Sequence, residues 1–214
     1  MPLIRENDRV LFIGDSVTDA GRDQDDPTHL GTGYVRFIAD ALRFGDWKSK
    51  VTVLNRGISG NRIEDLKQRW TTDCLDLKPD VVSVLIGIND TWRRYDRGQI
   101  TTVAAYEADY RNILDRARAE SDIRLVLIEP FMLSIRPEQD EWREDLDPRI
   151  RVVRTIADEY QATLVQADLA FQKAAQAVAA GDLADDGVHP SFIGHRLLAA
   201  EWLRAVGLRA AKSA

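Results

Sequence analysis

The chain has 214 residues, a length typical of one domain, so we expect residues 1–214 to fold as a single unit. Its 29 Lys and Arg against 35 Asp and Glu give a net charge of −6, which disfavours binding to nucleic acid because such binding depends on neutralising phosphates. The single cysteine, Cys74, excludes a disulfide scaffold. No run approaches 18 apolar residues and the first eight residues lack the pattern of a signal peptide, so we expect a cytoplasmic protein without a membrane partner.

Short apolar segments rich in β-branched residues alternate along the chain with amphipathic segments. Such short, nearly continuous apolar runs are typical of strands that helices cover on both faces. The expected strands are residues 9–13, 51–55, 81–86, 124–128 and 163–166. The expected helices are residues 33–44, 62–75, 103–120, 148–160, 168–180 and 191–206.

Two of these helices have clear start signals. Thr102 is expected to cap the helix over residues 103–120, and Asp147 followed by Pro148 supplies a cap and a proline at the first helical position. Residues 136–147 show no periodicity, and we interpret them as a surface excursion after the fourth strand.

The alternation of strand and helix predicts an α/β fold with a parallel sheet between two helical layers. In such sheets, ligands bind beyond the carboxyl ends of the strands. Three polar, glycine-bearing turns follow the first three strands: residues 14–16, 57–61 and 87–90. These turns are therefore expected to meet at one edge of the sheet.

Residues suited to nucleophilic catalysis fall at that edge and near the C-terminus. Ser16 follows the first strand directly, where its hydroxyl can point out of the sheet; a helix cap is the alternative interpretation. Asp186 lies three residues before His189, so its carboxylate can hold Nδ1–H of the imidazole and leave Nε2 free to take a proton from serine. Taken alone, this pair is more typical of a solvated loop than of a catalytic pair.

Three hydrogen-bond donors at the same edge are suited to an oxyanion. They are the backbone N–H groups of Ser16 and Gly60 and the side-chain amide of Asn89. Glycine and asparagine are also ordinary turn residues, so each one alone indicates little. The combination favours acyl transfer, because one sheet edge can assemble every part of the required site.

These residues resemble the four sequence blocks of the GDSL, or SGNH, hydrolase superfamily: Gly14-Asp15-Ser16, Gly60, Asn89 and Asp186-x-x-His189. Longer strings, among them NRGISGN at 55–61 and IGINDTW at 86–92, are similar to the acetylxylan-esterase-type carbohydrate deacetylases of that superfamily. The resemblance implies a flavodoxin-like three-layer α/β/α sandwich with five parallel strands in the order 2-1-3-4-5. The chain departs from these relatives at Asp185, where they carry tryptophan before the aspartate.

The resemblance implies a serine esterase that hydrolyses short-chain, acetyl esters through an acyl-enzyme. Ser16 would be the nucleophile, His189 the base and Asp186 the residue that orients it, with Ser16, Gly60 and Asn89 forming the oxyanion hole. No metal or organic cofactor is expected. The substrate would be a small ester or an acetylated oligosaccharide such as acetylated xylo-oligosaccharide.

Four further residues are candidates for substrate contact. Asp15 adjoins the nucleophile, although a structural role in the turn is the favoured interpretation. Trp92 and Tyr95 follow the Asn89 turn at the expected mouth of the crevice, and Asp185 adjoins Asp186. The sequence leaves open whether copies of the chain form a homo-oligomer.

Alternatives remain within and outside the esterases. A thioesterase or lysophospholipase would share the catalytic residues but need a long apolar acyl groove. A metal-dependent phosphoesterase would use a cluster of Asp15, Asp19, Asn89, Asp90, Asp186 and His189, but such centres usually need several imidazoles, and of the three histidines only His189 is expected near this site. A non-catalytic carbohydrate-binding protein of the same fold would not need the serine, aspartate and histidine.

Overall fold

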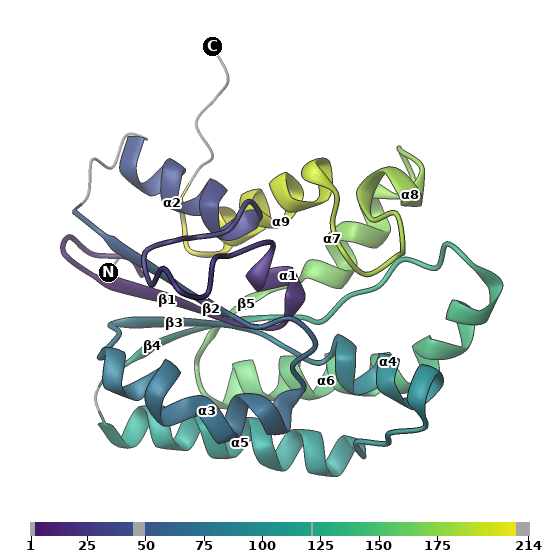
Figure 1. Ribbon diagram of the computed structural model, residues 1–214, viewed down its shortest axis with the longest axis horizontal. Helices are drawn as coiled ribbons and strands as arrows, with labels where there is room; N and C mark the ends of the chain where they lie inside the picture. The colour runs from purple at the N-terminus through teal and green to yellow at the C-terminus, as the bar shows by residue number, and fades with distance from the viewer. Residues whose placement is uncertain (1–2, 45–49, 121, 209–214) are drawn as a thin grey trace.

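The structure, a computed structural model, describes residues 3–44, 50–120 and 122–208, and in these residues a five-stranded parallel sheet has the order β2-β1-β3-β4-β5 (Figure 1). The strands are β1 (Arg9–Gly14), β2 (Thr52–Gly57), β3 (Val81–Leu85), β4 (Arg124–Ile128) and β5 (Thr163–Val165). The expected strand order and parallel pairing are confirmed.

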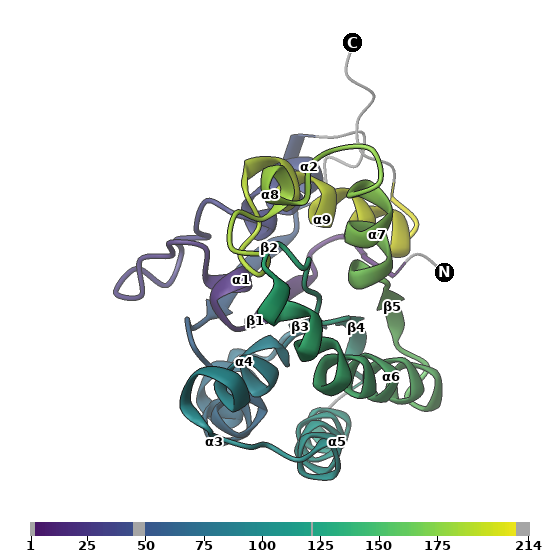
Figure 2. The same cartoon turned by 90° about the vertical axis from the view of Figure 1, so that its right-hand side faces the viewer.

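Helices cover both faces of the sheet and form a three-layer sandwich (Figures 1 and 2). One layer contains α2 (Tyr34–Phe44), α7 (Ala167–Ala174) and α9 (Phe192–Ala205), and the other contains α3 (Ile63–Asp73), α5 (Val103–Glu120) and α6 (Arg143–Glu159). The shorter elements are α1 (Ser16–Asp19), α4 (Ile88–Arg97), α8 (Ala180–Leu183) and the 3₁₀ helices η1 (Leu75–Leu77) and η2 (Pro137–Trp142).

Side chains of the strands alternate between the two apolar cores. In β1, Val10 and Phe12 belong to the core that contains α2 and α9, whereas Leu11 and Ile13 belong to the core that contains α3 and α5. All four side chains are completely buried. This alternation is the period of two that places successive strand residues on opposite faces of a sheet, and here both faces are covered.

The first three strands end side by side. Gly14, the last residue of β1, pairs with Gly57 of β2 on one side and with Leu85 of β3 on the other. A β carbon on Gly57 would lie 2.1 Å from the backbone nitrogen of Asp19, so only glycine allows α1 to lie this close to the end of β2. The loops that follow these three strands therefore start from adjacent points of one edge.

The interpretation of residues 136–147 as an irregular excursion, capped by Asp147, is wrong. Residues 137–142 form η2, and α6 begins at Arg143, so that Pro148 lies inside a helix. Buried contacts stabilise this earlier start: Asp145 pairs with Arg149 at 2.6 Å and with Arg94 of α4 at 3.0 Å. The tertiary ion pair with Arg94, together with the i,i+4 pair with Arg149 inside α6, thus outweighs the local helix-start signal of Asp147 and Pro148.

Two other helices differ from expectation. Residues 88–97, expected to begin as a turn, form α4, whose first turn buries Ile88, Asn89 and Asp90. The helix expected over 168–180 ends at Ala174, and α8 follows as a separate turn. The expected cap of α5 is present, because Thr102 Oγ1 accepts a hydrogen bond of 3.1 Å from the backbone N–H of Ala105.

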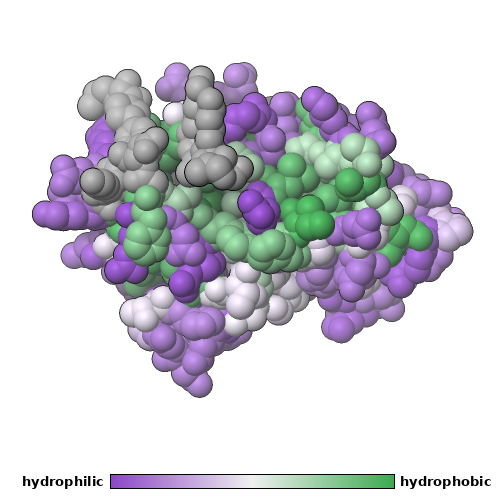
Figure 3. All heavy atoms as spheres, turned by 90° about the horizontal axis from the view of Figure 1, so that it is seen from above, coloured by the Kyte–Doolittle hydropathy of each residue, from purple (hydrophilic) through white to green (hydrophobic). Residues whose placement is uncertain are grey.

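The face over α2 and α9 carries apolar surface, as the space-filling view shows (Figure 3). Its largest exposed apolar side chains are Phe44, Phe192 and Ile193, and the Phe37 ring packs edge-on against Phe192 with 5.4 Å between ring centroids. In the part of the chain that the structure describes, no helix is long and apolar enough to span a membrane.

Replacing Gly57 with alanine should destabilise the fold. The new β carbon would meet backbone atoms of Thr18 and Asp19 that cannot rotate away, and overpacking of this kind costs about 1–3 kcal/mol. Thermal unfolding measured by calorimetry should show a melting temperature several degrees lower. Gly181→Ala in α8 is the matched control, because its β carbon would meet no atom within 4 Å and should leave the melting temperature equal or slightly higher.

Candidate active site

The site is built around Ser16 at the carboxyl end of β1. Asp15 caps the one-turn helix α1 by accepting a hydrogen bond of 3.0 Å from the N–H of Val17. This cap places Ser16 at the first helical position, half-buried, directly beyond the buried strand. The alternative interpretation, in which Ser16 caps a helix, is wrong: Asp15 is the cap, and the Ser16 hydroxyl is left for another partner.

That partner is His189, which lies in the loop before α9. Ser16 Oγ is 2.8 Å from His189 Nε2, and His189 Nδ1 is 2.6 Å from Asp186 Oδ2. The structure therefore brings together three residues that lie up to 173 positions apart in the sequence. Their order, hydroxyl to imidazole to carboxylate, is the one that serine hydrolases of unrelated folds share.

The loop geometry itself orients the carboxylate of Asp186. Its Oδ1 accepts hydrogen bonds from the backbone N–H groups of Val188 (2.8 Å) and His189 (2.7 Å), and Oδ2 is left for the imidazole. Gly187 between them has φ +83°, a conformation that glycine adopts without strain. The Asp-x-x-His spacing thus folds into a tight turn in which one carboxylate holds both backbone and ring.

The pKa values of the pair follow from these bonds. Burial opposes ionisation of Asp186, but hydrogen bonds from the His189 ring and from the backbone outweigh it and lower the Asp186 pKa to about 2. The hydrogen bond to Asp186, partly opposed by burial, raises the pKa of His189 above its ordinary value of 6.5. With Asp186 ionised, the neutral imidazole carries its hydrogen on Nδ1 and presents a basic Nε2 to Ser16.

Gly60 and Asn89 lie in the loops that follow the neighbouring strands. Asn89 sits in the first turn of α4 and donates one amide hydrogen to the carbonyl of Asn61 at 3.1 Å, which joins the two loops. Gly60 has φ +83°, and a β carbon there would meet no atom within 4 Å, so its backbone borders open space. The N–H of Ile58 in the same loop donates to the carbonyl of Gly14 at 3.1 Å, which fixes this loop against the end of β1.

Arg69 of α3 holds the loop after β2 against the end of β1 through hydrogen bonds. Its guanidinium donates to Asn61 Oδ1 (2.7 Å), to the carbonyl of Arg56 (2.8 Å) and to the carbonyl of Gly14 (2.9 Å). Asp19 of α1 contacts the same loop, because its carboxylate accepts hydrogen bonds from the N–H and the hydroxyl of Ser59 at 3.1 and 2.7 Å. The donors beside Ser16 are therefore held in place before any substrate binds.

The acidic residues considered for a metal centre are engaged elsewhere. Both oxygens of Asp19 accept hydrogen bonds, from Ser59 and from the N–H of Arg22, and Asp90 accepts from the N–H of Ile63 at 3.1 Å. Burial raises the pKa of Asp15 and of Asp90 to about 7 in each case. Asp15 caps α1, and Asp19 and Asp90 join neighbouring loops. These three carboxylates therefore do not converge on one point as metal ligands would.

The candidate substrate residues lie in different surroundings. Trp92 borders the site, because its ring centroid is 5.9 Å from that of His189 and 5.5 Å from that of Trp142. Tyr95 stacks on Trp142, and its hydroxyl donates to the carbonyl of Glu141 at 2.8 Å, so it joins α4 to η2. Asp185 is exposed next to Asp186, and its charge contributes to the raised pKa of His189.

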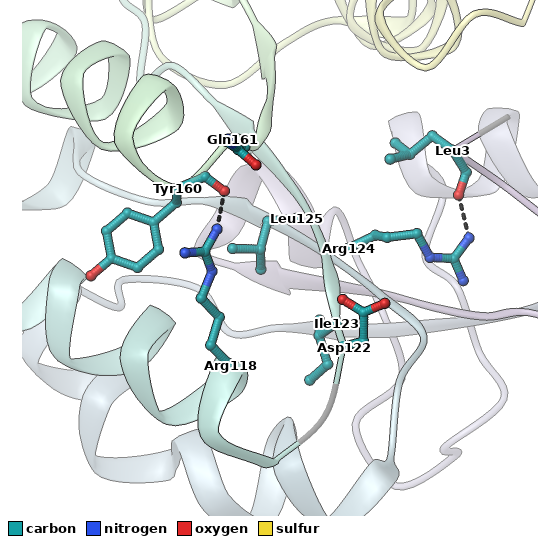
Figure 4. Close-up of a pocket in the computed structure, with 8 residues that line it drawn as sticks. All are labelled: Leu3, Arg118, Asp122, Ile123, Arg124, Leu125, Tyr160 and Gln161. Atoms are coloured by element: carbon teal, nitrogen blue, oxygen red, sulfur yellow. Dashed lines mark hydrogen bonds between the residues drawn. The ribbon is translucent and has the colours of Figure 1, made fainter. Parts of the chain in front are cut away.

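A separate hollow of about 520 Å³ lies at the opposite edge of the sheet (Figure 4). It is lined by residues at the start of β4, where Ile123 and Leu125 flank Arg124, and by Arg118, which donates to the carbonyl of Tyr160. The two arginines are engaged, Arg124 with the carbonyl of Leu3 and with Asp8 at 2.7 Å. This hollow is therefore remote from Ser16, which follows the carboxyl end of the sheet.

Two side chains that organise the site were given no role from the sequence. Arg69 of α3 belongs to a string, Arg69-Trp70, that resembles the carbohydrate deacetylases, but its hydrogen-bond partners could not be predicted. Gln139 lies in the segment without periodicity, yet its side chain is completely buried and donates to the carbonyl of Asp186 at 2.7 Å. Only the three-dimensional structure reveals both roles, because their partners lie in distant parts of the chain.

The hydrogen bond to Asp186 should control the titration of His189. In Asp186→Asn the imidazole loses its anionic partner, so the His189 pKa measured by NMR titration should fall from its raised wild-type value. Asp185→Asn is the control, because the charge of Asp185 is the smallest of the contributions and its loss should shift the pKa far less. An equal or larger shift in Asp185→Asn would contradict the assignment of Asp186 as the partner.

Comparison of the chain with known proteins finds a matching family and similar proteins. The model of the GDSL-like lipase/acylhydrolase family matches residues 12–197. The acetylxylan esterase of Geobacillus stearothermophilus is 37% identical over 218 residues, covering 98% of this chain and 99% of that protein. The crystal structure of Axe2, an acetylxylan esterase from the same organism, matches with a TM-score of 0.90 at 37% identity and covers 99% of each chain.

Two further structural matches agree. A putative GDSL-like lipase from Parabacteroides merdae has a TM-score of 0.93 at 35% identity, covering 98% of this chain and all of that one. Structures of catalytic mutants of Axe2, in which a serine, an aspartate or a histidine is replaced by alanine, match at 36% identity with a TM-score of 0.90 and cover 99% of each chain. The chain belongs to the GDSL-like lipase/acylhydrolase family.

Proposed function

We propose that this protein is a serine esterase that removes acetyl groups from a carbohydrate such as acetylated xylo-oligosaccharide. The observation that carries the proposal is the hydrogen-bonded series Ser16–His189–Asp186 at the carboxyl edge of the sheet, with distances of 2.8 and 2.6 Å. The similarity to an acetylxylan esterase over nearly the whole of both chains supports the acetyl and carbohydrate parts of the proposal. The serine, aspartate and histidine are also the residue types replaced in the catalytic mutants of Axe2.

In the first half-reaction, Ser16 Oγ attacks the carbonyl carbon of the acetyl ester while its proton passes to His189 Nε2. Asp186 stabilises the imidazolium that forms and keeps Nδ1 protonated. The tetrahedral intermediate then collapses, the C–O bond to the sugar breaks, and the imidazolium gives its proton to the departing alcohol. The products of this step are the free hydroxyl of the sugar and acetyl-Ser16.

In the second half-reaction, water attacks acetyl-Ser16 and passes a proton to His189. Collapse of the second tetrahedral intermediate returns that proton to Ser16 Oγ and releases acetic acid. Both intermediates carry a negative oxygen, which we assign to the N–H groups of Ser16 and Gly60 and to the second amide hydrogen of Asn89. Such preorganised donors typically contribute factors of about 10² to 10³ each to turnover.

We assign the sugar side of the site to Trp92 and Asp185. The C–H face of a pyranose packs well on an aromatic ring, and Trp92 lies beside His189 at the point where the alcohol leaves. Asp185 is exposed beside Asp186 and suited to accept hydrogen bonds from sugar hydroxyls. Tyr95 would then support Trp92 indirectly through Trp142, and Asp15 would position the nucleophile as the cap of α1.

The domain boundaries are part of the same proposal. The family model covers residues 12–197, and the β2-β1-β3-β4-β5 sheet draws its strands from Arg9 to Val165. We therefore treat residues 1–214 as one hydrolase domain.

Removing the nucleophile should abolish turnover. Ser16→Ala is expected to fold normally and to lose about 10⁶-fold in kcat on p-nitrophenyl acetate, the scale seen when other triad nucleophiles are removed. A serine-directed phosphonate should label the wild type and fail to label the variant, as mass spectrometry would show. Ser134→Ala, which removes an exposed serine hydroxyl in the segment after β4, should retain full activity and labelling. Retention of more than a few per cent of activity by Ser16→Ala would rule out this nucleophile.

Acyl-chain preference separates the deacetylase from a long-chain acylhydrolase. We expect kcat/KM to be greatest for acetyl esters and to fall through butyryl to octanoyl esters of one alcohol. An apolar acyl groove would instead gain about 0.8 kcal/mol per methylene, or about fourfold in kcat/KM for each one that fits. Activity that rises with chain length would favour the thioesterase or lysophospholipase alternative, and acetylated xylo-oligosaccharides would then be poor substrates.

A further inference from the structure

Gln139 is a buried amide in the segment between β4 and α6. Its side chain has no exposed surface, and its hydrogen-bonding groups are engaged on both sides. Oε1 accepts from the N–H groups of Ile135 at 3.0 Å and Arg136 at 3.2 Å, and Nε2 donates to the carbonyl of Asp186 at 2.7 Å. The amide therefore joins its own segment to a loop 47 residues further along the chain.

The loop that receives this bond carries Asp186 and His189. The carboxylate of Asp186 accepts hydrogen bonds from the N–H groups of Val188 and His189, so a shift of the backbone at Asp186 also shifts its carboxylate relative to the His189 ring. The position of the turn therefore determines where the carboxylate and the imidazole lie.

The turn is fixed to the rest of the molecule at Gly187. The N–H of Leu133 donates to the Gly187 carbonyl at 2.8 Å. A β carbon on Gly187 would lie 2.2 Å from the Leu133 carbonyl and 3.0 Å from Gln139 Nε2, which shows how closely the segment packs against the turn. Gln139 supplies the side-chain part of this contact, and Leu133 supplies the backbone part.

We propose that Gln139 is a positioning residue for catalysis, which sets the distance between the Asp186 carboxylate and the His189 ring by holding the Asp186 carbonyl. The proposal rests on the catalytic roles given to Asp186 and His189 above. Gln139 touches neither substrate nor the reacting atoms. It acts through the turn, and a displacement of about 1 Å in such a group can reduce turnover about 10²-fold.

The test compares Gln139→Met with a matched control, Gln172→Met. Gln172 on α7 makes a bond of the same kind to the same segment, from Nε2 to the Met132 carbonyl at 2.9 Å, but it does not contact the catalytic turn. Both variants lose one side-chain-to-carbonyl hydrogen bond, and Gln139→Met also loses the two bonds that Oε1 accepts from Ile135 and Arg136, so both should melt at a lower temperature. Only Gln139→Met should lose about tenfold to hundredfold in kcat, with KM for p-nitrophenyl acetate changed less than about twofold.

The pH profile distinguishes positioning from general stability. A longer Asp186–His189 bond raises the His189 pKa less, so the acid limb of kcat/KM should move to lower pH in Gln139→Met and stay in place in Gln172→Met. The other charged and titratable groups that act on the imidazole, Asp15, Asp185 and His195, are the same in both variants. Wild-type kcat and an unmoved acid limb in folded Gln139→Met would overturn the proposal.

A second variant covers the case in which Gln139→Met does not fold. Gln139→Glu has the same shape and keeps both acceptor bonds, but its ionised carboxylate cannot donate to the Asp186 carbonyl. At alkaline pH it should show the same loss of kcat, and wild-type kcat there would overturn the proposal. Ser16→Ala is assayed alongside to separate the two hypotheses. If Ser16→Ala is inactive while the Gln139 variants are fully active, only the positioning role of Gln139 is refuted. If Ser16→Ala is active, the proposed function is refuted.

Discussion

The close approach of backbone at the ends of β1 and β2 is the constraint on which the site depends. A β carbon on Gly14 would lie 2.1 Å from the carbonyl of Leu85, and one on Gly57 would lie 2.1 Å from the nitrogen of Asp19. With glycine at both positions, α1 lies against the end of β2, and Ser16 starts beside the loop that carries Gly60. Side chains there would separate Ser16, the proposed nucleophile, from the donors that we propose for the developing oxyanion.

Buried carboxylates around this edge have different ionisation states because their partners differ. Asp186 receives three hydrogen bonds from His189 and Val188, and they outweigh burial and keep its pKa near 2. Asp15 is buried completely with one backbone donor, and burial raises its pKa to about 7. Two aspartates of the same chain can therefore take different roles: Asp186 is the ionised partner of His189, and Asp15 is the cap in the turn that carries Ser16.

The parts of the structure that could be predicted are those encoded locally. The apolar runs predicted the strands, and the Gly14-Asp15-Ser16 and Asp186-x-x-His189 spacings predicted residues that the structure brings within hydrogen-bonding distance. The parts that could not be predicted depend on distant partners. Pro148 lies inside α6 because Asp145 is held by Arg94 of α4 as well as by Arg149 of its own helix, and no local pattern reports the pair with Arg94. The role of Gln139 could not be predicted either, because its partner, the carbonyl of Asp186, lies 47 residues further along the chain.

The loop that carries His189, the proposed base, shows why such distant partners are needed. Ser16 is fixed by a buried strand, whereas His189 reaches it from a loop 173 residues away that lies outside the sheet. Loops without buried apolar side chains open readily, and a catalytic hydrogen bond tolerates little displacement. Val188 is buried in an apolar cluster with Trp142, which ends η2, and Leu146 of α6. The segment between β4 and α6 and the start of α6 thus supply the packing that the sheet cannot give to His189, the proposed base.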